Sequence, residues 1–248
     1  MNTDLYENFA ERYDLSRDQF EPHDPQVIQF FRRIFTEHGT NTVLDCACGT
    51  GRHLLLFRNL GREVWGSDLS KAMLAQARRN LAHYRVEVPL ILTDYRDLPH
   101  HFQNRFDMVA CLGSIGYMHE EREILRAFRS MFAVLREGGI LVLSVITTDK
   151  QWMEKPRFKL VINTPDVSRL FVMDYFERTV RYHVLDIFHS EEVNQLKWWG
   201  TELTVLLMDE QDRLLKKAGF RMVEFYGGFD FSPYDEGSSD HLIAVIHK

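Results

Sequence analysis

A glycine-rich turn between a short apolar strand and a helix is the feature that most restricts the fold of this chain. The turn spans residues 44–51 and reads LDCACGTG. Gly49 and Gly51 carry no side chain that would keep a ligand from lying over the backbone, and the helix that follows presents free N–H groups. Asp68 ends the next predicted strand, 23 residues after Asp45, where its carboxylate can accept both hydroxyls of a ribose. These features predict an α/β nucleotide-binding unit.

The dinucleotide-binding fingerprint is the main competing interpretation of this turn. That fingerprint has a third glycine three residues after the second, and this chain has Leu54 at that position. It also usually follows the first strand of a domain, whereas two helices are predicted here before the strand. The sequence therefore disfavours a nicotinamide enzyme.

Strands and helices alternate along the first part of the chain. The expected strands are 42–47, 63–67, 86–93, 106–112 and 140–146, and the expected helices between them are 52–60, 71–82 and 121–135. Upstream, an amphipathic helical segment is expected near residues 5–13, and a helix should begin at Asp24-Pro25 and end at Gly39. This alternation is typical of βαβ units and predicts a doubly wound parallel sheet.

The pattern changes after Thr147. The segments 158–162, 169–176, 179–188 and 195–207 are rich in β-branched and aromatic residues, and no helix is expected among them. Segments of this kind predict antiparallel hairpins, here a small sheet inserted into the main fold. A helix at 209–218 and strands at 220–226 and 242–246 then complete the α/β pattern.

Two further strand ends should meet the glycine turn, because ligands in such sheets lie beyond the carboxyl ends of the strands. Residues 93–95 end the third strand and residues 110–114 end the fourth. Asp94 can accept a hydrogen bond from an adenine amino group, with Tyr95 and Met73 beside the ring. A turn aspartate and ordinary core packing explain each residue equally well alone, but together the strand ends form a consistent site.

Composition limits the classes of function. The chain has 248 residues, 45% of them apolar, and a formal charge of −6, which disfavours nucleic acid and favours small-molecule substrates. It has no apolar run of roughly 20 residues for a membrane span, and the polar residues 1–4 predict no signal peptide, so a cytoplasmic protein is expected. Cys46, Cys48 and Cys111 are expected to be packed free thiols, and no histidine spacing suggests a metal site.

Five segments, 43–53, 66–74, 93–99, 106–113 and 135–143, resemble in order the successive motifs of the class I, Rossmann-like S-adenosylmethionine-dependent methyltransferases. The resemblance implies S-adenosylmethionine as the cofactor. It also implies a doubly wound, mostly parallel seven-stranded sheet, closed by an antiparallel hairpin, with a small antiparallel β insertion after the fifth strand.

Within this superfamily the chain resembles the N-methyltransferases of glycine, sarcosine and amino sugars. Residues 6–13 are similar to their N-terminal lid, and Cys-Leu-Gly-Ser at 111–114 is similar to their fourth-strand motif. The inserted strands lie in the same position, and 228–234 resembles a substrate-side loop. The resemblance implies a Rossmann-like domain over 1–148 and 208–248, with a helical lid at 1–38, and an inserted cap subdomain over 149–207.

The same resemblance implies roles for individual residues. Tyr13 and Arg17 would approach the methionine end of the cofactor, Asp68 its ribose, and Asp94 and Tyr95 its adenine. The full expected cofactor-binding set is Tyr13, Arg17, Asp45, Ala47, Gly49, Gly51, Asp68, Leu69, Met73, Asp94, Tyr95, Cys111, Leu112 and Gly113. The glycine enzymes carry an arginine just after the fifth strand, where this chain reads SVITT at 144–148, and this difference argues against glycine as the substrate.

The chemistry of methyl transfer sets what the rest of the site must do. A sulfonium already makes its methyl group electrophilic, so the main tasks are in-line positioning and exclusion of water. A neutral amine needs no strong base, whereas a hydroxyl acceptor does. The candidate catalytic residues are Tyr13, Tyr117, His119 and Tyr234, although a surface or structural role is the more common one for a histidine.

The sequence thus predicts methyl transfer to a small-molecule acceptor, with nitrogen preferred. The alternatives are a small-molecule O-methyltransferase, an RNA methyltransferase and a non-catalytic protein that binds S-adenosylmethionine. The oligomeric state stays open, with a homodimer as one option.

Overall fold

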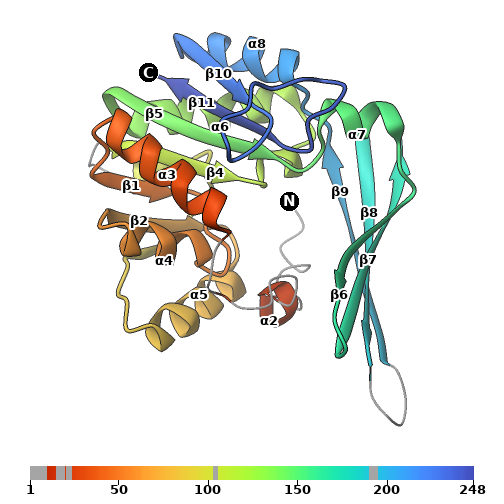
Figure 1. The fold of residues 1–248 in the computed structure, drawn as a ribbon. Coiled ribbons are helices and arrows are strands. Elements are labelled where there is room, and N and C mark those ends of the chain that lie inside the picture. The colour runs from red at the N-terminus through yellow and green to blue at the C-terminus, as the bar shows by residue number, and fades with distance from the viewer. Residues whose placement is uncertain (1–9, 15–19, 21–23, 103–105, 190–194) are drawn as a thin grey trace.

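The computed structural model describes residues 10–14, 20, 24–102, 106–189 and 195–248. The described chain forms a doubly wound α/β unit with a seven-stranded sheet, and a separate four-stranded antiparallel sheet (Figure 1). The order of the large sheet is β10-β11-β5-β4-β1-β2-β3, in which β11 runs antiparallel to both of its neighbours. Its strands are β1 (Thr42–Asp45), β2 (Glu63–Asp68), β3 (Leu90–Leu92), β4 (Phe106–Leu112), β5 (Leu135–Val145), β10 (Met222–Tyr226) and β11 (Leu242–His247).

Helices cover both faces of the seven-stranded sheet and bury two apolar clusters against it (Figure 1). One face is covered by α3 (Pro25–Glu37), α4 (Arg52–Asn59) and α5 (Lys71–His83), and the other by α6 (Glu121–Val134) and α8 (Met208–Ala218). Short elements are α2 (Ala10–Tyr13), α7 (Asp149–Glu154), η2 (Leu98–His100) and η3 (Ile115–Tyr117). The expected caps are confirmed: Asp24 accepts the Gln26 N–H at 2.7 Å, and Ser70 accepts the Met73 N–H at 3.2 Å.

The four-stranded sheet follows β5 and has the order β6-β7-β8-β9, with every neighbouring pair antiparallel. Its strands are β6 (Phe158–Asn163), β7 (Val167–Tyr175), β8 (Thr179–Phe188) and β9 (Gln195–Thr204). The predicted antiparallel insertion is therefore confirmed. Before it lies α7, a helix not predicted from the sequence, which begins where Thr148 Oγ1 accepts the Gln151 N–H at 3.2 Å.

The starts of the third and fifth strands differ from the prediction, each for a local reason. The third strand is only Leu90–Leu92, and Pro89 directly before it has no N–H to give to a sheet ladder. Strand β5 begins at Leu135 instead of residue 140, and it passes through Gly138 and Gly139. A Cβ at Gly139 would lie 3.0–3.1 Å from three carbonyl oxygens, so only glycine allows the backbone to pass there.

Cys46, Cys48 and Cys111 are buried free thiols, as predicted. Within the described part of the chain, no helix combines the length and apolar character that a membrane span requires.

Candidate active site

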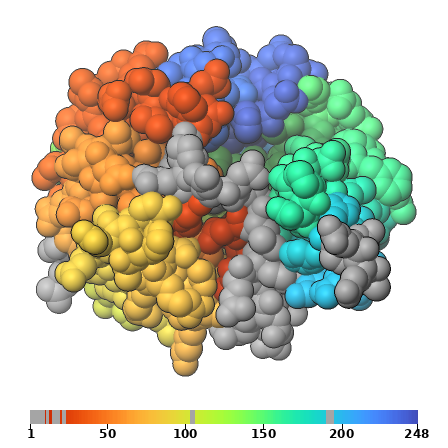
Figure 2. Space-filling model, turned by 60° about the horizontal axis from the view of Figure 1, so that its bottom comes forward, coloured from red at the N-terminus to blue at the C-terminus, as the bar shows by residue number. Residues whose placement is uncertain are grey.

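A cavity of about 250 Å³ lies between the carboxyl ends of the parallel strands and the inner face of the four-stranded sheet. One side, the strand-end wall, consists of Ala47, Gly49, Asp68, Leu69, Asp94, Tyr95, Leu112 and Gly113. The opposite side, the sheet wall, consists of Arg169, Phe171, Tyr182, Val184, Trp199, Thr201 and Leu203. Figure 2 shows α2, in red, between α5 and the four-stranded sheet, and Tyr13 of α2 also lines the cavity.

The glycine turn follows β1 and brings bare backbone to the cavity. Gly49 has φ +52° and Gly51 has φ +89°, a region that L side chains rarely adopt. A Cβ at Gly49 would point toward the Tyr13 ring, 4.0 Å from its Cε1 atom. A Cβ at Gly51 would instead lie 3.2 Å from the Cβ of Ala77 on α5. The absence of a side chain at Gly49 thus leaves space in the cavity, whereas its absence at Gly51 allows α4 to begin close to α5.

Asp68 connects the end of β2 to the glycine turn. Its Oδ2 accepts the Gly49 N–H and its Oδ1 accepts the Ser70 N–H, both at 2.9 Å. Burial raises the pKa of Asp68, and the backbone donors partly oppose this rise. Each carboxylate oxygen can accept more than one hydrogen bond, so Asp68 can also serve a ligand in the cavity.

Asp45 lies behind the turn rather than in the cavity lining. It is 1% exposed, and its Oδ1 accepts the Ala47 N–H at 3.3 Å. Burial raises the pKa of Asp45 to about 7, and the nearby charge of Asp68 adds to the rise. In this site, Asp45 therefore holds the backbone of the glycine turn in place.

The loops after β3 and β4 are tied to one another. The Tyr95 hydroxyl donates to the Ser114 carbonyl at 3.3 Å, and Ser114 Oγ lies 3.2 Å from Cys111 Sγ. Asp94 accepts the Arg96 N–H at 2.8 Å and also pairs with the Arg96 guanidinium, at 2.6 Å from Nη2. These bonds fix Asp94 and Tyr95 at the edge of the cavity.

A second set of contacts attaches α2 to the main fold. Asp14 accepts hydrogen bonds from Thr50 Oγ1 at 2.7 Å and from Asn80 Nδ2 at 3.1 Å, and Asn80 also donates to the Thr50 carbonyl at 3.0 Å. We call Asp14, Thr50 and Asn80 the clasp. It holds the residue next to Tyr13 against the glycine turn. The clasp could not be predicted from the sequence, because nothing in the local pattern pairs Asp14 with two residues far along the chain.

The sheet wall follows the alternation of its strands. Because successive side chains point to opposite faces, every second residue of β7, β8 and β9 faces the cavity. Arg169 is 3% exposed, and its Nε and Nη2 atoms bind the two oxygens of the fully buried Asp186 at 2.5 and 2.9 Å. The Tyr182 hydroxyl lies 2.9 Å from Thr147 Oγ1 and accepts from Gln151 Nε2 at 2.8 Å.

Most of the residues expected from the sequence meet at this cavity. Those in its lining are Tyr13, Ala47, Gly49, Asp68, Leu69, Met73, Asp94, Tyr95, Leu112 and Gly113. Asp45, Gly51 and Cys111 are not in the lining, and Cys111 is fully buried below it. Arg17 lies outside the described residues.

Two of the four candidate catalytic residues line the cavity and two do not. Tyr13 and Tyr117 line the cavity. His119 does not, and its Nδ1 lies 3.2 Å from Thr204 Oγ1. Tyr234 is also outside the lining: its hydroxyl donates to Asp149 at 2.6 Å and accepts the Asp149 N–H at 3.0 Å.

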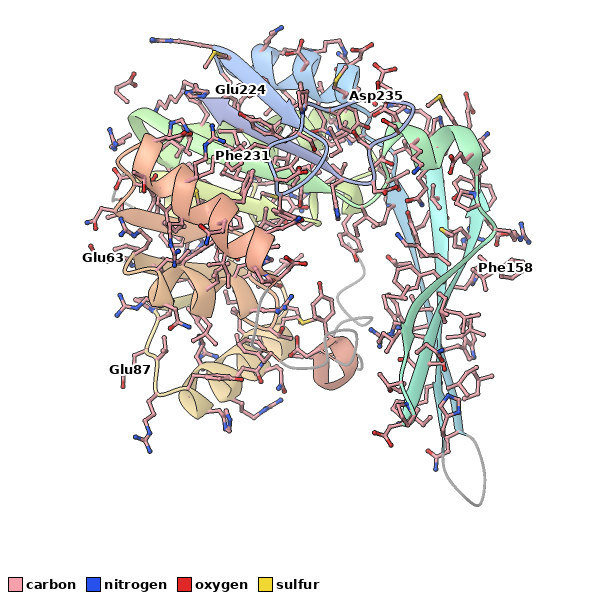
Figure 3. The ribbon with its side chains drawn as sticks, viewed as in Figure 1. Glu63, Glu87, Phe158, Glu224, Phe231 and Asp235 are labelled. Carbon is pink, nitrogen blue, oxygen red and sulfur yellow. The ribbon has the colours of Figure 1, made fainter. Side chains whose placement is uncertain are left out.

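The C-terminal loop, expected on the substrate side, packs elsewhere. The rings of Phe229 and Phe231 lie 5.4 and 4.5 Å from the Phe30 ring of α3, measured between centroids. Figure 3 shows Phe231 over that helix. Burial of two aromatic rings on α3 holds the loop there, away from the described lining of the cavity.

Comparison with known proteins agrees with this architecture. A methyltransferase domain family matches residues 43–139. The glycine/sarcosine N-methyltransferase of Aphanothece halophytica is 28% identical, over 98% of this chain and 89% of that protein. A protein of Geobacillus sp. (strain WCH70), named as a methyltransferase, is 30% identical over 98% of this chain and 99% of its own length.

Solved structures share the fold at lower identity. An S-adenosylmethionine-dependent methyltransferase from Clostridium acetobutylicum ATCC 824 has a TM-score of 0.81 at 16% identity, covering 98% of both chains. A sugar N-methyltransferase from Streptoalloteichus sp. ATCC 53650 has a TM-score of 0.71 at 24% identity, covering 96% of this chain and 92% of that one. The present chain belongs to the class I S-adenosylmethionine-dependent methyltransferases, and S-adenosylmethionine is its methyl donor.

Proposed function

We propose that this enzyme transfers the methyl group of S-adenosylmethionine to an amine nitrogen of a small molecule held against the sheet wall. The main support for this proposal is the set of titratable side chains that line the cavity. Among the described lining residues none is a histidine, and the carboxylates, Asp68 and Asp94, belong to the strand-end wall. A hydroxyl acceptor needs a base close to the reacting oxygen, whereas a neutral amine does not. The glycine/sarcosine and sugar N-methyltransferases among the similar proteins support nitrogen as the acceptor.

The strand-end wall suits the nucleoside part of S-adenosylmethionine. Asp68 is a partly buried carboxylate with a raised pKa, so ribose hydroxyls that donate to it would stabilise its charged form. Asp94 would accept the adenine amino group, with Tyr95 and Met73 against the ring. The bare backbone at Gly49 leaves room for the methionine part beneath Tyr13. Arg17, Asp45, Gly51 and Cys111 stay expectations from the resemblance rather than parts of this assignment.

The cofactor supplies an electrophilic methyl group on a positively charged sulfur. The residues of the chain would then orient the acceptor and keep water away. Phe171, Val184 and Leu203 offer apolar surface for the body of the acceptor, and Tyr117 and Tyr182 offer polar atoms at its edges. We also propose that residues 149–207 act as a cap over the acceptor and residues 1–38 as a lid.

Product analysis tests this function directly. Purified protein is incubated with methyl-labelled S-adenosylmethionine and matched pairs of small molecules, each pair an amine and the corresponding alcohol, including amino sugars and sarcosine. We expect labelled N-methyl products from amines and no label on the alcohols. Exclusive O-methylation, transfer to RNA instead of amines, or cofactor binding without transfer to any acceptor would each refute the proposal.

A further inference from the structure

Arg169 brings a positive charge to the wall that faces the acceptor. It lies on the inner face of β7, and among the described residues that line the cavity it is the one lysine or arginine. A guanidinium in a ligand cavity is a common partner of a carboxylate, because its planar fork binds both carboxylate oxygens at once. The state of the Arg169 charge therefore bears on whether the acceptor can carry a carboxylate.

Asp186 already takes the place of such a carboxylate. Its two oxygens bind Nε and Nη2 of Arg169 at 2.5 and 2.9 Å, the side-by-side geometry that a substrate carboxylate would adopt. The side chain of Arg169 is 3% exposed and that of Asp186 is 0% exposed, so water and salt screen this pair little. Toward the cavity, the two residues thus act together as a neutral unit.

Neighbouring charges do not restore a positive charge to the sheet wall. Lys197 lies opposite Asp186 in the register of β8 and β9, but it is exposed and its Nζ lies 5.4 Å from the centroid of the Phe188 ring, outside the cavity lining. The other charged residues in the described lining are Asp68 and Asp94, both acidic. An acceptor carboxylate would lose its hydration and find in the described lining no cation that is not already paired, which is costly.

Stability alone does not account for this pair. Replacing a buried ion pair with apolar residues of similar volume is often neutral or stabilising, so such a pair contributes little to the fold as a unit. The pair of Arg169 and Asp186 lies in the wall of a ligand cavity, where its charge state acts on whatever binds there. This position favours a role in recognition of the acceptor.

We propose that Asp186 sets the class of acceptor: by neutralising Arg169, it makes the enzyme specific for amines that carry no carboxylate. In this proposal Asp186 is a positioning residue, because it acts through Arg169 and is not itself in the cavity lining. The inference rests on the proposed transfer to an amine nitrogen. It narrows that function to amines whose other groups are uncharged.

A matched pair of acceptors tests the proposal. Sarcosine and sarcosinamide differ in a carboxylate against a carboxamide, and the ratio of their kcat/KM values reports on that group. The wild-type enzyme should methylate sarcosinamide and use sarcosine poorly. Asp186→Asn keeps the shape of the side chain but leaves the charge of Arg169 without its counter-ion. The sarcosine-to-sarcosinamide ratio should then rise roughly tenfold or more, mainly through KM. A purely structural role of Asp186 would lower both kcat/KM values alike and leave the ratio unchanged.

Two control variants separate charge from a loosened cavity. Arg169→Met/Asp186→Leu removes both charges, so its ratio should stay at the wild-type value. Asp174→Asn makes the same change on the opposite face of β7, where Asp174 pairs with Arg157, and it should also leave the ratio unchanged. Binding of S-adenosylmethionine shows that each variant is folded. The wild-type preference is measured on the folded enzyme, whatever the stability of Asp186→Asn.

Calorimetric titration with acetate and acetamide, in the presence of the demethylated cofactor, gives a readout without turnover. Acetate should bind Asp186→Asn more tightly than wild type, whereas acetamide should bind both alike. The proposal would be overturned by a wild-type kcat/KM higher for sarcosine than for sarcosinamide, by an unchanged ratio in Asp186→Asn, or by equal acetate affinity in the two proteins. A wild-type enzyme that methylates no amine would instead refute the proposed function, and the acetate titrations would still decide the role of Asp186.

Discussion

The two walls of the cavity hold their polar groups in different ways. On the strand-end wall, and just behind it, the carboxylates of Asp45, Asp68 and Asp94 each accept a backbone N–H from a residue two positions further along the chain or from the glycine turn. On the sheet wall, polar side chains bind one another between neighbouring strands: Arg169 of β7 pairs with Asp186 of β8.

This difference determines which residues of each wall can be substituted without loss of the fold. Backbone donors persist whatever the neighbouring side chains are, so the strand-end wall tolerates variation around a fixed set of acidic residues. A side-chain pair must change both members together. We infer that the strand-end wall serves a ligand common to the family, while the sheet wall can diverge with the acceptor.

The largest expected effect concerns the buried pair on the sheet wall. Asp186→Ala removes the carboxylate that binds Arg169, and loss of one member of a buried ion pair costs about 3–5 kcal/mol. The free energy of unfolding, measured by urea denaturation, should fall by that amount. The double variant Arg169→Met/Asp186→Leu should recover most of the loss, because no buried charge is left alone. A single variant as stable as wild type would contradict the contrast between the walls.

A pH-dependent effect should follow from Asp45, behind the strand-end wall. Its pKa of about 7 lies above the ordinary value of 3.8, so the folded chain keeps a proton that the unfolded chain releases between these values. The resulting stabilisation is complete below about pH 4 and is lost as the pH rises through 7. It corresponds to about 4 kcal/mol at most.

Asp45→Asn tests this because its amide cannot ionise. Relative to wild type, the unfolding free energy of the cofactor-free variant should increase between pH 4 and pH 7. Glu63→Gln, an exposed position on the neighbouring strand β2, is the control and should show no such trend. Parallel curves for wild type and Asp45→Asn would rule out a buried, protonated Asp45.

The next effect concerns affinity rather than stability. Asp68→Ala removes the acceptor proposed for the ribose hydroxyls, and hydrogen bonds to a charged group contribute about 1.5–3 kcal/mol, which corresponds to roughly 10–150-fold in affinity. Calorimetric titration with S-adenosylmethionine should show this loss. Asp212→Ala, which removes only the surface pair with Lys216, should bind as wild type does. Unchanged affinity in Asp68→Ala would remove Asp68 from the proposed site.

The same contrast explains how far the sequence predicts the site. The strand-end wall is made of residues directly after predicted strands, so topology alone brings Asp68, Asp94 and Tyr95 together. Arg169 and Tyr182 lie on strands that were predicted, yet alternation does not tell which face of an inserted sheet will turn toward the main fold. Asp186 lies opposite Arg169 in the register of the β7–β8 pair, whereas Thr147, the partner of Tyr182, lies outside the inserted sheet.

Loops were the least predictable part for a related reason. The loop at 228–234 contains Phe229 and Phe231, which had two apolar surfaces available, the cavity and α3. The packing of their rings on Phe30 decides between these surfaces, and no local pattern encodes that choice. Tyr234, which follows them, is therefore directed to Asp149 instead of the cavity lining.

The smallest effect should come from the clasp, where Asp14, in the proposed lid, binds the strand-end side of the fold. Asp14→Ala removes both hydrogen bonds that Thr50 and Asn80 donate to it. Because the clasp is only partly buried, we expect its removal to lower the free-energy barrier to S-adenosylmethionine release by about 1 kcal/mol. Stopped-flow fluorescence should then show a roughly fivefold faster release of the cofactor.

Thr50→Val should have a smaller effect than Asp14→Ala, and the double variant should be no worse than Asp14→Ala alone, because both changes remove the same bond. Thr36→Val is the matched control: its hydroxyl donates to the Arg32 carbonyl on the surface of α3, remote from the clasp. Thermal stability should change little in all three single variants. Additive effects of Asp14→Ala and Thr50→Val on the release rate would show that they act separately, and the proposed lid would then be held by contacts other than the clasp.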